Sequence, residues 1–290
     1  MAKKVGTIDF DGRTIRLLIS KSGKVLHWAS ATVSAQVMNQ GLIVNPEEMA
    51  KEIQGLLGSK GVPRKRFVTS LTGHRTASRL ITVPRVKTKF LDEAVRRKAK
   101  QEMPLPMDET YLSWQVLGVK NGQIKIYAFA VPKVVIDRQV ETLKIAKLKP
   151  QAMDLKPLAL ARAVHDPNCI IANLEDQSAG VVLVVYGTPE LIRSVPQTTE
   201  DASPQERVEK LAQELSRTVQ FYDEGHRDTP LDPKTKVYAT GLYLEAENIR
   251  ELLAEHTPYE VVLPPPSIQV PEEFPVAAFS ANLGLAMKSF

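Results

Sequence analysis

The chain has 290 residues, of which 43% are hydrophobic and 24% are charged, and its formal net charge is +5. These proportions are typical of a globular protein with either two domains or one bilobed fold. No apolar run approaches the ~20 residues that a membrane-spanning helix needs. The single cysteine, Cys169, excludes an internal disulfide, and residues 1–4 lack the apolar stretch of a secretory signal. We therefore expect a cytoplasmic protein.

The first part of the chain predicts a β-meander, then a helix, then two more strands. The helix has clear start and stop signals: Asn45 is a good N-cap, Pro46 suits the first helical position, Glu48 can close a capping box, and Gly58 ends the helix. Alternating apolar residues between turn residues predict the strands. They are expected at 5–8, 14–19, 25–29, 67–71 and 78–83.

The next segment, from Pro84 to Leu148, predicts a small α+β unit. It contains an amphipathic helix, two strands that pair around the turn Asn121-Gly122, and a second helix. These elements are expected at 89–103, 112–117, 124–131 and 134–147. A further helix, rich in leucine and alanine, is expected over 153–163.

The second half of the chain begins with the same pattern as the first. Strands at 168–174, 180–185 and 191–195 repeat the opening meander, which is typical of a duplicated two-lobe fold. Ser203, Pro204 and Glu206 form a cap, a first position and a capping box for a long helix. The remaining elements are expected at 236–240, 246–255, 260–263 and 276–288.

Three loops resemble the phosphate and adenosine loops of an actin-type nucleotide fold, and all three depart from the usual pattern. Such loops need glycine so that their backbone N–H groups can close on an anion. Asp11, Glu175 and Leu242 stand where glycine is usual, and two of these residues add negative charge. We assign the following residues to a vestigial nucleotide site: Asp9, Asp11, Gly12, Arg13, Thr14, Arg16, Asn173, Glu175 and Gly241.

A longer series of residues resembles the PilM family, the actin-like proteins of type IV pilus assembly. The most distinctive block comprises Val83-Pro84, 90–95, 101–106, Glu109 and Tyr111. Further matches follow in order at 130–133, 153–155, 159–162, 214–222 and 282–288. The resemblance therefore covers nearly the whole chain.

The resemblance implies an α/β, actin-like (FtsA/PilM-type) bilobed fold with an inserted α+β subdomain and a reduced second lobe. The second lobe is expected to be reduced because only a few polar residues lie between Gln197 and Ser203, where the family has a helix-bearing segment. The expected parts are a first lobe, an inserted subdomain, a second lobe, and a C-terminal helix that returns to the first lobe. Their expected bounds are 1–83 with 149–166, 84–148, 167–275 and 276–290.

The resemblance also implies a partner. PilM proteins bind the cytoplasmic N-terminal peptide of PilN, a bitopic inner-membrane protein, in a groove that involves the inserted subdomain. The expected function is a non-catalytic adaptor at the inner face of the cytoplasmic membrane, held there by its partner, with motor ATPase machinery as a further partner. The residues expected to form the groove are Leu80, Ile81, Val83, Phe90, Val95, Arg96 and Lys98.

Other functions remain open at this point. The first alternative is an ATPase or ATP-gated switch with ATP and Mg²⁺ as cofactors, in which Asp9 organises the metal and Arg13, Thr14 and Arg16 contact phosphate. Against it, a carboxylate close to a polyanion costs on the order of one to a few kcal/mol. We therefore expect no enzyme activity, and we assign no catalytic or metal-binding residue.

Three further readings are weighed. The cytoplasmic domain of type II secretion GspL proteins has the same fold and is a second family alternative. A membrane-surface module could use the basic stretch 96–100. Nucleic acid is not an expected partner, because few aromatic residues lie among these charges to stack on bases.

Overall fold

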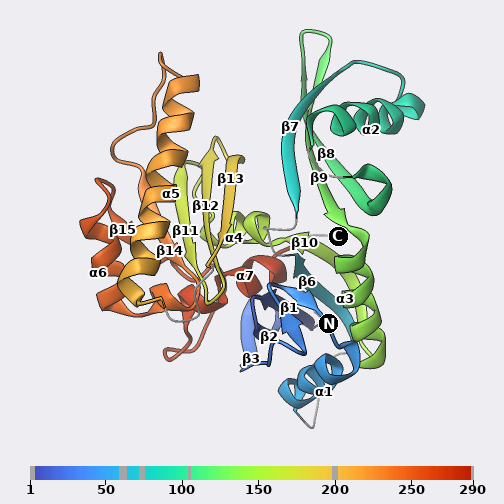
Figure 1. Cartoon of the computed structure of the whole chain (residues 1–290), viewed down its shortest axis with the longest axis vertical. Coiled ribbons are helices and arrows are strands. Elements are labelled where there is room, and N and C mark those ends of the chain that lie inside the picture. The colour runs from blue at the N-terminus through green and yellow to red at the C-terminus, as the bar shows by residue number, and fades with distance from the viewer. Residues whose placement is uncertain (1–3, 59–63, 72–75, 104–105, 198–201, 289–290) are drawn as a thin grey trace. The chain divides into compact units, whose positions relative to one another are not determined.

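The computed structural model describes residues 4–58, 64–71, 76–103, 106–197 and 202–288 (Figure 1). The chain divides into two compact units. The main unit comprises residues 1–73 and 140–290, and the inserted unit comprises residues 74–139. Each unit is described below by itself.

The main unit contains two five-stranded sheets with the same strand order, β10-β6-β1-β2-β3 and β15-β14-β11-β12-β13. In each sheet the meander strands pair antiparallel, whereas the two crossover strands pair parallel. The strand-for-strand repeat confirms the two-lobe fold. The first lobe contains β1 (Val5–Asp11), β2 (Thr14–Lys21), β3 (Lys24–Thr32), β6 (Lys65–Leu71) and β10 (Lys149–Leu155). The second contains β11 (Cys169–Leu174), β12 (Ser178–Val185), β13 (Thr188–Pro196), β14 (Lys236–Thr240) and β15 (Val261–Val262).

Helices cover the sheets of both lobes. The main helices are α1 (Pro46–Leu57), α3 (Lys133–Ile145), α4 (Lys156–Val164), α5 (Pro204–Gly225), α6 (Glu247–Glu255) and α7 (Val276–Ala286). Apolar side chains of α1 and of the end of α3 pack on the first sheet, and those of α5 and α6 pack on the second. In the main unit α4 and α7 lie between the two sheets (Figure 1). They cross so closely that a Cβ atom at Gly284 would lie 1.8 Å from the carbonyl oxygen of Ala159, so only glycine fits there.

The two predicted helix starts with capping signals are confirmed. Asn45 accepts a hydrogen bond from the backbone N–H of Glu48, and Pro46 is the first residue of α1. Ser203 and Glu206 form a reciprocal capping box at the start of α5. These caps satisfy backbone donors that have no partner within the helix.

The inserted unit is a three-stranded antiparallel sheet with α2 (Leu91–Glu102) on one face. Its strands are β7 (Ala77–Pro84), β8 (Thr110–Lys120) and β9 (Gln123–Pro132), in the order β7-β9-β8. Asn121 and Gly122 both have positive φ, as the predicted tight hairpin turn requires. Because β9 is central, β7 and β8 each have one outer edge that pairs with no other described strand.

The structure corrects several expected boundaries. Strand β7, which was expected in the first lobe, pairs along its whole length with β9 and therefore belongs to the inserted sheet. Conversely, Leu143 and Ala146 near the end of α3 were expected in the inserted subdomain, but they pack in the core of the first lobe. The helix expected over 153–163 begins only at Lys156, because residues 149–155 pair in parallel with β6 as β10.

Parts of two sequence arguments lie outside the described residues. These parts are residues 104–105 of the distinctive block and residues 198–201 of the short connection before α5. Among the described helices, none is both long and apolar enough to cross a membrane.

Candidate functional site: a buried ion cluster between the lobes

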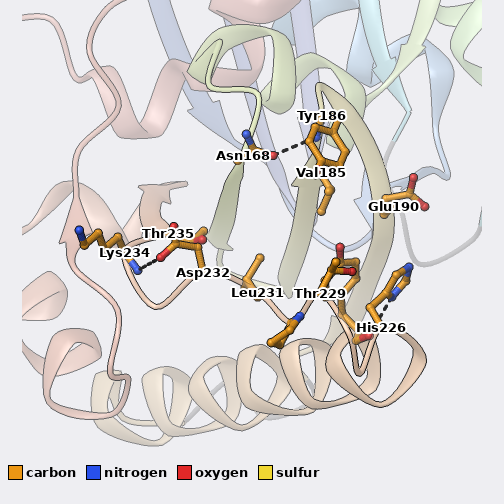
Figure 2. A pocket seen from close by; sticks show the side chains of 12 residues that line it. Asn168, Val185, Tyr186, Glu190, His226, Thr229, Leu231, Asp232, Lys234 and Thr235 are labelled. Atoms are coloured by element: carbon orange, nitrogen blue, oxygen red, sulfur yellow. Dashed lines mark hydrogen bonds between the residues drawn. The ribbon is translucent and has the colours of Figure 1, made fainter.

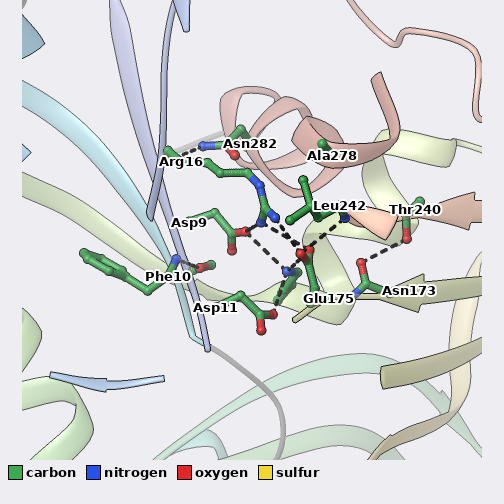
Figure 3. Close-up of polar contacts among 12 residues, drawn as sticks. Asp9, Phe10, Asp11, Arg16, Asn173, Glu175, Thr240, Leu242, Ala278 and Asn282 are labelled. Atoms are coloured by element: carbon green, nitrogen blue, oxygen red, sulfur yellow. Dashed lines mark hydrogen bonds and ion pairs between the residues drawn. The ribbon is translucent and has the colours of Figure 1, made fainter. Parts of the chain in front are cut away.

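Five charged side chains meet where the two lobes of the main unit face each other (Figure 3). Strand β1 carries Asp9 and Asp11, and the adjacent strand β2 carries Arg16, which lies opposite Asp9 in the hairpin. Helix α4 contributes its first residue, Lys156, and the second lobe contributes Glu175 directly after β11. Each of the five residues is at most 4% exposed. We call this group the ion cluster.

The hydrogen bonds of the ion cluster match its donors to its acceptors. Lys156 Nζ donates to Asp11 Oδ2 at 2.7 Å, to Glu175 Oε1 at 2.9 Å and to Asp9 Oδ2 at 3.3 Å. An ammonium group has three N–H donors, so this one is fully used. Arg16 donates from both terminal nitrogens to the two carboxylate oxygens of Glu175 and also to Asp9 Oδ2 at 3.1 Å. Such a forked pair is the strongest geometry for an arginine and a carboxylate.

The charges of the ion cluster shift the pKa values of its members in different directions. Burial alone would raise the pKa of Asp9 and of Glu175, but Lys156 and Arg16 outweigh this effect and hold both pKa values below their ordinary range. Burial lowers the pKa of Lys156 and of Arg16, but the surrounding carboxylates reverse this and raise both. Three carboxylates face two cations, and Asp11 is the carboxyl whose pKa is raised, by burial and by the charges of Glu175 and Asp9.

Neighbouring polar groups hold the ion cluster in place. Ser178 Oγ donates to Asp11 Oδ1 at 2.8 Å, and the backbone N–H of Leu242 donates to Glu175 Oε2 at 3.3 Å. From α7, Asn282 Nδ2 donates to the carbonyl oxygen of Arg16 at 3.0 Å (Figure 3). Residues of both lobes and of both intervening helices thus position these five charges.

The other residues assigned to the vestigial site lie around the ion cluster. Gly12 has φ of +56° and packs against Gln177, while Arg13 lies 3.7 Å from Asp176 across the lobes. Thr14 is buried in the β1–β2 hairpin. These residues therefore contact the turn that follows β11, or lie close to it, and none of them is part of the ion cluster.

The two assigned residues of the second lobe have structural contacts. Asn173 Oδ1 accepts a hydrogen bond from Thr240 Oγ1 at 3.1 Å and so links β11 to β14. Gly241 has φ of +94°, and a Cβ atom there would lie 2.5 Å from the carbonyl oxygen of Leu174. Local packing therefore accounts for glycine at this position without any phosphate.

Sequence reasoning missed Lys156 and Ser178. A signal for Lys156 was present, since Asp9, Asp11 and Glu175 in adjacent loops outnumber the single Arg16. Buried carboxylates require a cationic partner. Lys156 is a lone lysine between Leu155 and Pro157, at the start of an apolar segment.

The residues of the ion cluster do not fit a nucleotide with Mg²⁺. A phosphate group placed here would meet three carboxylates, and Lys156 already uses all three of its donors. A metal ion would have to displace the same ammonium group from the same oxygens. The arrangement joins the two lobes through charges that the chain itself supplies.

The expected peptide-groove residues fall into two groups. Ile81, Val83 and Val95 are each at most 2% exposed in the core of the inserted unit, which corrects the expectation that their side chains line a groove. Leu80 is partly exposed, and Phe90 is 48% exposed. The exposed charges each have a partner on α2: Arg96 Nε lies 2.7 Å from Asp92, and Lys98 Nζ lies 2.6 Å from Glu102.

Comparison with solved structures identifies the fold class as actin-like. A structure titled "PilM-PilN type IV pilus biogenesis complex" aligns with a TM-score of 0.80 and 22% identity, covering 98% of this chain and 97% of that one. The cytoplasmic domain of EpsL, an inner membrane component of the type II secretion system of Vibrio cholerae, aligns at 0.57 with 13% identity, covering 99% and 97%. A Bacteroides thetaiotaomicron protein with an actin-like ATPase fold aligns at 0.52 with 9% identity, covering 98% and 96%.

The family follows from a comparison with family models. The model described as type IV pilus assembly protein PilM matches residues 8–191, which is more than half of the chain. Comparison with curated proteins finds no match. This chain belongs to the PilM family, as the resemblance in the sequence predicted.

Proposed function

We propose that this protein is a non-catalytic adaptor of a type IV pilus assembly platform, which binds a peptide of a membrane-anchored partner rather than a nucleotide. The observation that carries the proposal is the ion cluster, where both lobes meet in buried, mutually paired charges. A hydrolase of this fold needs open acidic groups for Mg²⁺ and backbone donors for phosphate. Here the acids are already paired with Lys156 and Arg16.

The inserted unit offers a surface for an extended peptide. The outer edge of β7 pairs with no other described strand, so an added strand can form main-chain hydrogen bonds with it. Leu80, on the sheet face opposite Ile81 and Val83, and the exposed Phe90 supply accessible apolar surface near this edge. Because Ile81 and Val83 are buried, main-chain pairing rather than side-chain pockets supplies most of the contact at β7.

The partner that fits this proposal is the N-terminal cytoplasmic segment of a PilN-like inner-membrane protein. The support is family membership together with the fold shared with the PilM–PilN complex. Such a partner would hold this chain at the inner face of the cytoplasmic membrane. The fold is also shared with the EpsL domain, so a role in a type II secretion platform is the second candidate.

The test is capture of a synthetic peptide that corresponds to the cytoplasmic N-terminus of the PilN-like protein encoded beside this chain. A set of peptides methylated at single backbone nitrogens examines the binding mode. In an added strand only alternate N–H groups face the neighbouring strand. We expect methylation at alternate positions to abolish capture and methylation at the intervening positions to leave it intact.

The outcomes separate the alternatives. Capture that is equally sensitive to methylation at all positions would contradict strand addition at β7. No capture of the pilus peptide, with capture of the corresponding segment of a type II secretion partner, would favour the second candidate. Capture that requires ATP and Mg²⁺ would contradict the non-catalytic adaptor and favour the ATP-gated switch.

A further inference from the structure

The second lobe contains a cavity that shares no residue with the ion cluster. It has a volume of about 470 Å³ and lies between the β12–β13 turn, the end of α5 and the loop that follows α5 (Figure 2). An adjoining hollow of about 290 Å³ shares Glu190, Tyr222 and His226 with it. Volumes of this size accept a large side chain or a small ligand.

Aromatic side chains give this surface its character. Tyr186, on the turn, is 88% exposed, and Phe221, beside the adjoining hollow, is 56% exposed. Tyr222 stacks on His226 with ring centroids 4.2 Å apart and an angle of 15° between the rings. Three aromatic rings thus gather at one end of α5, although aromatic residues make up only 6% of the chain.

The conformation of Tyr186 sets it apart from an ordinary surface residue. Its φ is +50°, in the left-handed region that asparagine and glycine adopt at lower cost. The turn pairs Val185 with Thr188 and needs no large side chain between them. Nothing in the folding of this hairpin therefore accounts for a tyrosine at its tip.

The charges that line the two hollows are mainly acidic. Glu190 and Asp232 line the cavity, Glu224 lines the adjoining hollow, and Lys234 is the one lysine among the lining residues. This acidic patch lies on a chain whose net charge is +5. Carboxylates beside aromatic faces are the surroundings that a guanidinium group prefers.

The same surface already accepts a guanidinium group from within the chain. The Arg193 guanidinium lies over the Phe221 ring, 5.4 Å from its centroid. This contact uses Phe221 and leaves the more exposed ring of Tyr186 to other partners. A second guanidinium from outside the chain would therefore meet a surface of the same chemistry.

We propose that this cavity receives an arginine side chain from a segment of a partner protein. The guanidinium stacks on the ring of Tyr186 and pairs with the carboxylate of Glu190, while the neighbouring residues of the segment lie over Tyr222 and Phe221. The surface is separate from the edge of β7, so this chain can bind two protein segments at once. The inference does not depend on the proposed partner at β7.

Fluorescence anisotropy with labelled heptapeptides tests the inference on the full chain. The probes are Gly-Ser-Arg-Gly-Arg-Ser-Gly and the two matched peptides in which lysine or glutamate replaces both arginines. The net positive charge of the protein opposes non-specific binding of the basic probes. We expect the arginine peptide to bind more tightly than the lysine peptide, and the glutamate peptide not to bind.

Variants locate the binding site. Tyr186→Asn suits the left-handed backbone, so the melting temperature should stay the same or rise, while affinity for the arginine peptide falls about threefold to thirtyfold. Glu190→Gln should weaken binding of both basic peptides. Tyr111→Asn, which removes an exposed aromatic ring of the inserted unit, is the matched control and should not change affinity.

Two results would overturn the inference. One is an arginine peptide that binds no more tightly than the glutamate peptide. The other is unchanged affinity in Tyr186→Asn with the melting temperature preserved.

Discussion

The ion cluster and the outer edge of β7 are the two most informative polar regions of this protein, and they differ in how their hydrogen-bonding groups are satisfied. In the ion cluster every charged side chain is buried and paired with another side chain of the chain. At β7 the outer main-chain groups have no partner strand within the described sheet. The first region has no capacity left for a ligand, whereas the second retains it. This contrast is the physical basis for an adaptor on an actin-like fold.

The largest expected effect comes from removing the ammonium group of the ion cluster. Lys156→Met leaves three buried carboxylates facing only Arg16. Breaking a buried ion pair by removing one partner typically costs about 3–5 kcal/mol. Urea unfolding should show a loss of this size in the free energy of unfolding.

The matched control is Lys51→Met, which removes an exposed lysine that pairs with Glu48 on α1. It should change stability by less than about 1 kcal/mol, because exposed ion pairs contribute little. Equal losses in the two variants would contradict the account of the ion cluster.

The next effect concerns the helices that carry the ion cluster. Gly284→Ala places a methyl group against the carbonyl oxygen of Ala159 on α4, the helix that begins at Lys156. Overpacking of this kind costs about 1–3 kcal/mol. Gly55→Ala on α1 is the control, since a Cβ atom there meets no atom within 4 Å. The control should be stabilised by about 0.5–1 kcal/mol, because alanine is the better helix former.

The pH dependence of stability separates the three carboxyl groups. Asp9 and Glu175 have lowered pKa values in the folded state, with burial opposed and outweighed by Lys156 and Arg16. Their contribution is therefore complete above the unfolded pKa values of about 3.9 and 4.3. It is lost as the pH falls below about 4 and through the folded values. Asp11 has a raised pKa, so its contribution is present at low pH and is lost as the pH rises.

Asp11→Asn tests this difference. Relative to the wild type, the variant should gain stability as the pH rises from about 4 to 8. Its gain at neutral pH should be smaller than the loss in Lys156→Met. Unfolding curves collected across this range provide the measurement, and a variant that loses stability relative to the wild type as the pH rises would contradict the assignment.

The smallest expected effect concerns the open region. Arg96 and Lys98 are exposed and already paired with Asp92 and Glu102, so reversing both charges should weaken capture of the PilN-like peptide only about twofold to fivefold. The melting temperature should not change. A complete loss of capture would show that these charges, rather than the main chain of β7, provide most of the binding.

The elements with local signals could be predicted from the sequence. The cap at Ser203 and the turn at Asn121-Gly122 are set by neighbouring residues, and the structure confirms both. Strand β10 could not be predicted, because residues 149–155 become a strand only through parallel pairing with the distant β6. The eroded loops were visible as acidic residues in place of glycine. What replaced the phosphate was not, because Lys156 and Glu175 meet Asp9 only through the packing of the two lobes.

Calorimetric titration of the purified full chain with ATP and Mg²⁺ tests the central claim most directly. Because Lys156 and Arg16 already neutralise the carboxylates between the lobes, we expect no saturable heat at micromolar ligand. Saturable micromolar binding that Asp9→Ala abolishes would contradict the claim and would favour a nucleotide-gated switch.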